Sequence, residues 1–389
     1  MKYIVTKLRR FCGFSAGIIF YISGILKLLD PTGAGLVMDE YFTFLHLDFL
    51  EAGSKIAGTA AAFAETAIGA ALITGVWRRT TGIAAMIMQG FFTLLTLALV
   101  IFKPEMDCGC FGEAIHLTHM QTFLKNLFIM VLLAANFIPA RGLGRPRRRK
   151  FISFGLVMVS TLAFTVYSWM YIPLAEFTDY KPMAHLQASE QYPVNEEDMY
   201  EAVFTYEKNG KQKTFDLDHL PDSSWTFIST ETVLKDEFQD SYVTLSIYDD
   251  EGSYHDSLAT EGKVMVISLY DPEIKEARWN EIERFAAEAE AYGFRPLIIA
   301  ADKGTPTEKG IYKSDYKTLI TLNRSNGGVT YFSDGYLIRK WARRTTPDSE
   351  ELQKLMNEAE TETMIGYSSQ SNLTFQAFLL YVFAVMLLL

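Results

Sequence analysis

Long apolar runs alternate with short charged segments over the first 173 residues, and one more apolar run closes the sequence. A helix that spans a bilayer needs about 20 mostly apolar residues. The pattern therefore predicts spanning helices over residues 11–29, 55–77, 81–102, 123–140, 151–173 and 373–389. The first run follows Lys7-Leu8-Arg9-Arg10, as a secretory signal would. No small-residue cleavage site follows it, so we interpret it as a helix that is retained.

Between residues 174 and 370 the pattern changes to that of an α/β domain. Asn209-Gly210 separates two strand-like runs, 203–206 and 214–217, which is a strong hairpin signal. A second hairpin is expected over 243–252. The further elements expected are a buried strand over 263–269, a helix over 279–292, a parallel strand over 296–300, a hairpin of 329–332 with 336–341, and a helix over 349–358 capped by Asp348 or Ser349.

Charge follows the same division. Residues 174–370 hold 20 Lys and Arg against 37 Asp and Glu, whereas the rest of the chain holds 16 against 9. Binding to nucleic acid needs a concentrated basic face, so this acidic domain argues against a nucleic-acid partner.

Basic residues gather in the segments before the first helix, between the second and third, and between the fourth and fifth. They are Lys7, Arg9, Arg10, Arg78, Arg79 and the six basic residues of 141–150. Such loops remain in the cytoplasm. We therefore expect a multi-pass protein of the bacterial inner membrane, with the N-terminus inside and the domain of residues 174–370 in the periplasm. That compartment is oxidising, which permits thiol–disulfide chemistry.

The chain has three cysteines, and two of them form Cys108-Gly109-Cys110 between the third and fourth helices. A disulfide across one residue closes a very small ring, which departs from relaxed geometry and is easily reduced. The pair is one candidate for redox exchange with a client or partner thiol, although nearby acidic residues oppose the lowered thiol pKa that attack requires. It is also a candidate for a permanent small-ring disulfide, or for two reduced cysteines that only shape the loop.

Metal binding is a third interpretation of the same pair. Cys108, Cys110, His116 and His119 form a C-x-C-x5-H-x2-H array, whose ligands suit zinc or, with nearby methionines, copper. The C-x-C spacing is tighter than usual for zinc. Thr118 with Gln121 also has the pattern of a capping box that opens the fourth helix, which makes His119 a first-turn residue.

Glu65 lies near the middle of the second helix, where a charge costs about 2.5–3.5 kcal/mol. Lys27, near the outer end of the first helix, is its nearest plausible partner. In the alternative, Lys27 extends to the membrane surface and Glu65 stays neutral and hydrogen-bonded to a neighbouring helix. A functional Glu65 would carry a proton or bind a polar ligand such as a quinone head group. The many small residues of this helix indicate close packing at the centre of a bundle.

Four motifs of the helical part resemble the MauE branch of the DoxX-like membrane proteins. They are Ser23-Gly24-x-x-Lys27, Glu65-x-x-x-Gly69, Cys108-Gly109-Cys110-Phe111-Gly112 and Lys125-Asn126, with Lys where that branch usually has Arg. The resemblance covers roughly residues 10–140, and the complete arrangement is similar to a DoxX-family group of Bacteroidetes proteins. MauE proteins are implicated in maturing methylamine dehydrogenase, a periplasmic enzyme rich in disulfides, and other DoxX-like proteins are associated with quinone-linked sulfur oxidation. The resemblance implies membrane redox support for outer-compartment proteins, without implying methylamine metabolism.

The order of elements over about residues 240–360 resembles a thioredoxin-like fold of the peroxiredoxin and TlpA type. The catalytic residues of that fold are missing. Its C-x-x-C position corresponds to Asp271-Pro272-Glu273-Ile274, and the loop that carries its cis-proline corresponds to Asn326-Gly327-Gly328. Neither thiol exchange nor peroxide reduction is expected there, and the domain is interpreted either as a docking module or as an α/β domain of unknown role.

The fold class expected is thus an α-helical membrane bundle with an extracytoplasmic α/β domain of thioredoxin-like type. Its parts are a four-helix DoxX/MauE-like domain (1–140), a basic loop with a fifth helix (141–173), a periplasmic domain (174–370) and a C-terminal helix (373–389). The function expected is thiol–disulfide maturation of periplasmic or envelope client proteins, with a quinone as the candidate cofactor. The alternative is a non-catalytic scaffold or assembly subunit of an envelope complex.

Overall fold

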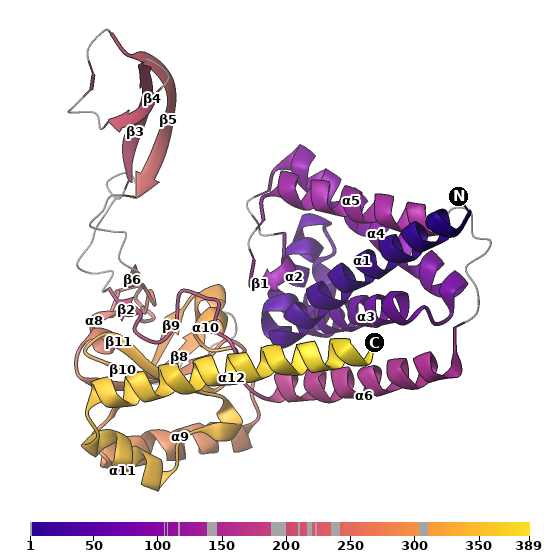
Figure 1. The fold of residues 1–389 in the computed structure, drawn as a ribbon. Coiled ribbons are helices and arrows are strands. Elements are labelled where there is room, and N and C mark those ends of the chain that lie inside the picture. The colour runs from indigo at the N-terminus through magenta and orange to yellow at the C-terminus, as the bar shows by residue number, and fades with distance from the viewer. Residues whose placement is uncertain are drawn as a thin grey trace.

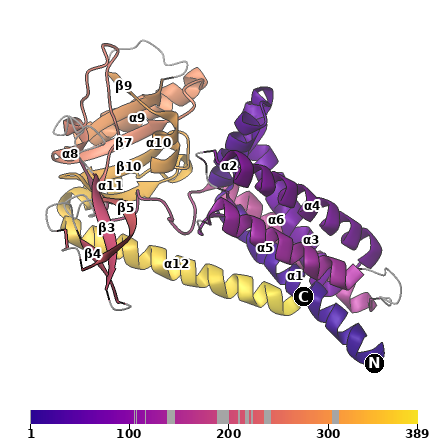
Figure 2. The ribbon, with the colours of Figure 1, turned by 90° about the horizontal axis from the view of Figure 1, so that it is seen from above.

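The computed structural model describes residues 2–104, 106, 108–115, 117–137, 146–187, 200–208, 211–215, 220–221, 224–234, 242–302 and 310–389. Figure 1 shows a helical bundle and a mixed α/β part, with a small separate sheet beyond them. The last helix extends from the α/β part back along the bundle (Figures 1 and 2).

Within the described residues, six helices are long and apolar enough to cross a membrane. They are α1 (Lys2–Leu29), α3 (Ser54–Thr74), α4 (Arg78–Phe102), α5 (His119–Phe137), α6 (Arg148–Met170) and α12 (Glu360–Leu388). This confirms the six predicted spans, although α12 begins well before position 373. Its first, more polar turns pack on the α/β part, where the Arg339 guanidinium lies 5.6 Å from the Tyr367 ring centroid.

The close packing of α1 on α3 depends on small residues. A Cβ atom added to Gly69 would lie 2.4 Å from the backbone nitrogen of Tyr21 and 2.8 Å from the carbonyl oxygen of Gly17. Neither backbone atom can move away cheaply, so only glycine permits this crossing. The small residues of α3 therefore bring Glu65 within reach of side chains on α1.

A short helix, α2 (Pro31–Phe44), follows α1 and was not predicted. Asp30 ends α1, as expected, and then caps α2, because its Oδ1 accepts a hydrogen bond from the Gly33 N–H at 2.9 Å. Pro31 occupies the first helical position, where its missing N–H has no cost. A 3-10 helix, η1 (Asp48–Gly53), connects α2 to α3.

The α/β part contains, within the described residues, a seven-stranded sheet of order β6-β2-β11-β10-β7-β8-β9. The strands are β2 (His185–Leu186), β6 (Tyr242–Val243), β7 (Lys263–Leu269), β8 (Arg295–Ala301), β9 (Ile311–Ser314), β10 (Gly328–Ser333) and β11 (Tyr336–Trp341). β7, β8 and β9 are parallel, whereas β10 and β11 are antiparallel to their neighbours. One face packs on α9 (Glu276–Ala291) and α11 (Ser349–Asn357), and the other on α8 (Ser257–Thr260) and α10 (Tyr316–Leu322).

This sheet confirms the α/β pattern after residue 240, with one exception. Residues 243–252 do not form the predicted hairpin. β6 pairs in parallel with β2, and only an isolated antiparallel bridge joins Tyr248 to Tyr254. The acidic turn between them is closed locally, because Asp249 Oδ1 accepts from the backbone N–H groups of Glu251 and Ser253.

A second sheet of order β4-β3-β5 stands apart from both in Figure 1. Its strands are β3 (Tyr200–Lys208), β4 (Lys211–Phe215) and β5 (Thr226–Leu234). The antiparallel pairing of β3 with β4 confirms the first predicted hairpin, and Phe204 lies opposite Phe215. The Asn209-Gly210 turn itself lies outside the described residues.

Ion pairs connect the α/β part to the end of the bundle where α1 gives way to α2. Arg324 Nε lies 2.9 Å from Asp30 Oδ2, and only 3% and 10% of these side chains are exposed. Lys317 Nζ donates to Glu40 Oε1 at 2.9 Å farther along α2. The Asp30–Arg324 pair is thus buried at this junction, whereas the Lys317 side chain is 65% exposed.

Candidate functional site: a cavity beside the cysteine pair

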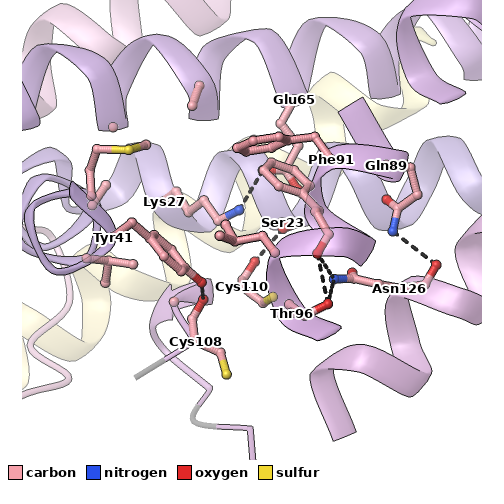
Figure 3. Close-up of a pocket in the computed structure, with 18 of the residues that line it drawn as sticks. Ser23, Lys27, Tyr41, Glu65, Gln89, Phe91, Thr96, Cys108, Cys110 and Asn126 are labelled. Carbon is pink, nitrogen blue, oxygen red and sulfur yellow. Dashed lines mark hydrogen bonds and ion pairs between the residues drawn. The ribbon is translucent and has the colours of Figure 1, made fainter. Parts of the chain in front are cut away.

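A mainly apolar cavity of about 270 Å³ opens between the helices at the end of the bundle nearest the α/β part. Side chains of α1, α2, α3, α4 and α5 line it, together with the Cys108–Cys110 segment. Its polar lining residues are Ser23, Lys27, Tyr41, Glu65, Gln89, Thr96, Lys125 and Asn126. Figure 3 shows several of them around the two cysteines. An apolar cavity with a few polar groups at fixed positions is typical of a small-molecule site.

Side chains of two helices form hydrogen bonds to the backbone of the cysteine segment. The Tyr41 hydroxyl of α2 donates to the Cys108 carbonyl oxygen at 2.7 Å, and the Ser23 hydroxyl of α1 donates to that of Cys110 at 2.6 Å (Figure 3). Cys108 is 4% exposed, and Cys110, which begins β1 (Cys110–Glu113), is partly exposed. All three cysteines are present as thiols. Both of these hydrogen bonds are made to the backbone of the segment.

Gly109 is required between the two cysteines. Its φ is +56°, in the left-handed region that favours glycine. A Cβ atom at this position would lie 2.2 Å from Cγ1 of Val37 on α2. The glycine therefore lets the loop lie directly against α2.

Lys27 and Glu65 form an ion pair inside the same cavity. Lys27 Nζ lies 2.6 Å from Glu65 Oε2, and their side chains are 16% and 8% exposed. This pairing is one of the two alternatives that the sequence left open, the other being a Lys27 that extends to the membrane surface and a neutral Glu65. Lys27 Nζ also lies 5.5 Å from the centre of the Phe92 ring. The pair places one positive and one negative side chain at the wall of the cavity.

The opposite wall is a neutral hydrogen-bond network. Asn126 Nδ2 donates to Thr96 Oγ1 at 3.2 Å and to the Phe92 carbonyl oxygen at 3.3 Å, while Gln89 Nε2 donates to the Asn126 carbonyl oxygen at 3.1 Å (Figure 3). Lys125 lies 4.5 Å from the Phe111 ring centre. The Lys125-Asn126 motif thus contributes to the cavity wall and to the loop that follows Cys110.

Tyr41 is a site residue that sequence analysis missed, because its helix was not expected. Burial raises the pKa of Tyr41 well above its usual range, and the neighbouring thiols add to this effect. The phenol therefore remains a hydrogen-bond donor at neutral pH. Gln89 was also missed, although a glutamine within an apolar run was a signal that could have identified it.

Of the two histidines in the proposed metal array, His119 is described and His116 is not. His119 Nε2 lies 3.0 Å from the carbonyl oxygen of Met106. Thr118 and Gln121 form the predicted capping box, because the Thr118 N–H donates to Gln121 Oε1 at 3.0 Å and the Gln121 N–H donates to Thr118 Oγ1 at 3.3 Å. Among the described residues, no group of three or more His, Cys, Asp or Glu side chains is placed to hold a metal ion.

These features define a multi-pass membrane protein with an internal cavity next to two cysteines. Residues 4–139 match a family model described as Methylamine utilisation protein MauE, and residues 200–237 match one described as Domain of unknown function (DUF8463). No curated protein and no solved structure matches the chain. The first match and the six apolar helices fit a membrane protein of the MauE type.

Proposed function

We propose that this protein supports the thiol–disulfide maturation of proteins outside the cytoplasm, and that Cys108 and Cys110 are its redox pair. The observation that carries the proposal is that both cysteines line the same cavity as the Lys27–Glu65 ion pair. A dithiol beside a proton-exchanging pair, in an apolar cavity, is the arrangement that electron transfer to an apolar carrier requires.

The electron acceptor in this proposal is a quinone. In the forward step the dithiol loses two electrons and two protons and forms the Cys108–Cys110 disulfide, while the quinone gains both and becomes the quinol. The disulfide then accepts two electrons from a client dithiol, whose own disulfide forms. Glu65 and Lys27 would pass protons to and from the quinone oxygens, and a short, strained disulfide would be a good oxidant.

The difference in exposure assigns different roles to the two cysteines. Cys110 is partly exposed and would form the mixed disulfide with the client. Cys108 is 4% exposed and would be the leaving thiolate when a client thiolate attacks Cys110. The second client thiol would then displace Cys110, which releases the client as a disulfide and leaves both cysteines as thiols for reoxidation by the quinone. In this proposal the N-terminus lies inside a bacterial inner membrane, and the cysteine loop and residues 174–370 lie in the periplasm. The basic segments support this orientation.

The α/β part would hold the client without chemistry of its own. The sheet order β11-β10-β7-β8, with α9 between β7 and β8, supports a thioredoxin-like fold. At the corresponding active-site edge, Asn326 joins the two loops, since its amide exchanges hydrogen bonds with the backbone of Asp271 at 2.7 and 3.1 Å. No cysteine occurs after position 110.

A scaffold or assembly function is the second candidate. The buried Asp30–Arg324 ion pair favours it, because it fixes the cysteine-free α/β part to the bundle. In that case the cysteines only shape the loop, and their substitution by serine would leave function intact.

Trapping of thiols in cells distinguishes the two candidates. Acid quenching and alkylation should find the wild-type pair in both the dithiol and the disulfide form. Cys108→Ser should accumulate a mixed disulfide of Cys110 with a client, since Cys110 can still exchange with a client disulfide and no Cys108 thiol is present to displace the client. Cys110→Ser should accumulate none, and Cys12→Ser is the matched control that should behave as wild type. If neither loop variant differs from the Cys12 control, the redox proposal is wrong and the scaffold remains.

A further inference from the structure

A second cavity, of about 210 Å³, lies between the bundle and the α/β part, and it is strongly basic. Its lining includes the cationic side chains of Lys55, Arg278, Arg324, Arg343 and Arg344, and none of its lining residues is acidic. Four of these cations come from the part of the chain in which acidic residues outnumber basic ones by 37 to 20. Positive charge is therefore concentrated here against the overall balance of that part.

Most of this charge is not neutralised by the protein. Asp30 neutralises Arg324. Glu281 lies 3.9 Å from Arg343 Nε, at the limit of an ion pair, and its side chain is 54% exposed. Within the described residues, Lys55, Arg278 and Arg344 have no ion pair. Cations gathered in a recess repel one another, and an anion that binds there relieves the repulsion.

The backbone around the recess is firmly held. The Arg343 N–H donates to Ser325 Oγ at 3.0 Å, and the Tyr270 hydroxyl donates to the Arg324 carbonyl oxygen at 3.3 Å. Both bonds join segments that are distant in sequence. The guanidinium groups therefore extend from a fixed frame, which reduces the ordering cost of binding.

The other side of the recess belongs to the ends of membrane helices. Trp169 and Tyr171 lie at the end of α6, and Lys55 at the start of α3, with Nζ 5.0 Å from the Trp169 ring centre. Trp, Tyr and Lys at such positions are typical of the boundary between lipid and water. The recess thus lies at the depth of lipid head groups.

We propose that this recess binds a phosphate-type oxyanion. Arginine pairs with phosphate through two parallel hydrogen bonds, and a phosphate offers enough oxygens to contact several of these cations at once. The position suggests the phosphodiester of an anionic phospholipid as the source, and a phosphate compound from the aqueous phase would use the same contacts.

The test uses the full chain, purified in detergent and in nanodiscs. Native mass spectrometry in detergent measures the affinity for phosphatidylglycerol and for phosphatidylcholine, and calorimetry measures the affinity for sn-glycerol 3-phosphate. Nanodiscs with and without phosphatidylglycerol show whether thermal stability follows the same preference. We expect binding of phosphatidylglycerol to exceed that of phosphatidylcholine by about tenfold and to weaken with salt.

The decisive variant is the pair Arg278→Gln with Arg344→Gln, which removes the two arginines that have no ion pair among the described residues. We expect the affinity for the anionic probes to fall about tenfold. Arg284→Gln, on the same helix as Arg278 but outside this recess, is the matched control and should change affinity less than about twofold. The double substitution Arg278→Lys with Arg344→Lys keeps the charge and tests folding, and it should retain part of the binding.

Each outcome decides the proposal. Loss of phosphatidylglycerol binding alone supports a lipid head group, and loss of glycerol 3-phosphate binding as well supports an anion site that is also open to water. Equal binding of the two lipids together with no binding of glycerol 3-phosphate overturns the proposal. So does a glutamine double variant that matches the Arg284 control.

Discussion

Replacement of both partners of the Lys27–Glu65 ion pair should be no more harmful to stability than replacement of one. At 2.6 Å, two unit charges attract each other by roughly 6 kcal/mol at an effective dielectric constant of about 20. Removal of each charge from water costs several kcal/mol, so the pair as a whole contributes little. A single substitution, however, leaves the other charge buried without its partner. Because the side chains are 16% and 8% exposed, water compensates only slightly.

We therefore expect Lys27→Met and Glu65→Leu each to lower the free energy of unfolding by about 3 kcal/mol. The double variant should lose about 3 kcal/mol or less instead of about 6, which is a coupling energy of about 3 kcal/mol. Reversible unfolding in mixed micelles, followed by circular dichroism at increasing SDS fraction, measures all four proteins. If the double variant loses the sum of the two single losses within about 0.5 kcal/mol, the pair is not coupled as described.

Three further predictions concern the loop, the junction and the sheet. Gly109→Ala would press a methyl group against Val37 and hold an alanine at a positive φ, so it should lower the free energy of unfolding by about 1–3 kcal/mol. The loop thiols should then be alkylated faster, which mass spectrometry can measure. Asp30→Ala would leave Arg324 buried without its carboxylate partner and should lower the free energy of unfolding by about 3 kcal/mol. Hydrogen exchange in α2 should become faster, and an unchanged exchange rate would contradict this prediction. Burial raises the pKa of Tyr331 to about 12, so the folded state holds this proton more tightly than the unfolded state, and stability should fall between pH 10 and 12, by about 2–3 kcal/mol. Tyr331→Phe should remove the fall in stability between pH 10 and 12 that Tyr331 causes, as measured by unfolding curves over this pH range. If the variant shows the same fall as the wild type, Tyr331 is not its cause.

The helical bundle could be predicted from sequence because one strong physical rule governs it. Spanning helices need long apolar runs, and a charge such as Glu65 must find a partner such as Lys27. The same rule missed α2, which is too short to span a membrane. Its role depends on tertiary contacts, since one side holds Tyr41 against the cysteine loop and its first turn meets the α/β part.

The junction and both cavities could not be predicted for a different reason. Asp30 and Arg324 are separated by 294 positions, and no local pattern in either segment indicates the other. The basic recess likewise combines side chains from three distant parts of an acidic domain and two membrane helices. The local periodicity of apolar residues predicts helices and strands, whereas these sites are formed only when those helices and strands pack together.

The strands of the large sheet could be predicted only in part. The sequence predicted the buried strand over 263–269 and the hairpin that ends at Trp341, because their hydrophobic patterns and turn residues are strong. It did not predict β2 and β6, which have two residues each. β2 extends the sheet by a short antiparallel pairing with β11, and β6 pairs in parallel with β2. Such strands have too few residues for a periodic signal.

Anaerobic reaction of the reduced, purified protein with a short-chain ubiquinone tests the central claim most directly. We predict one quinol formed per protein, with a loss of two mass units from the peptide that contains Cys108 and Cys110, no change at Cys12, and no reaction in Cys108→Ser. An unchanged quinone spectrum, with both loop cysteines still alkylatable, would contradict the account.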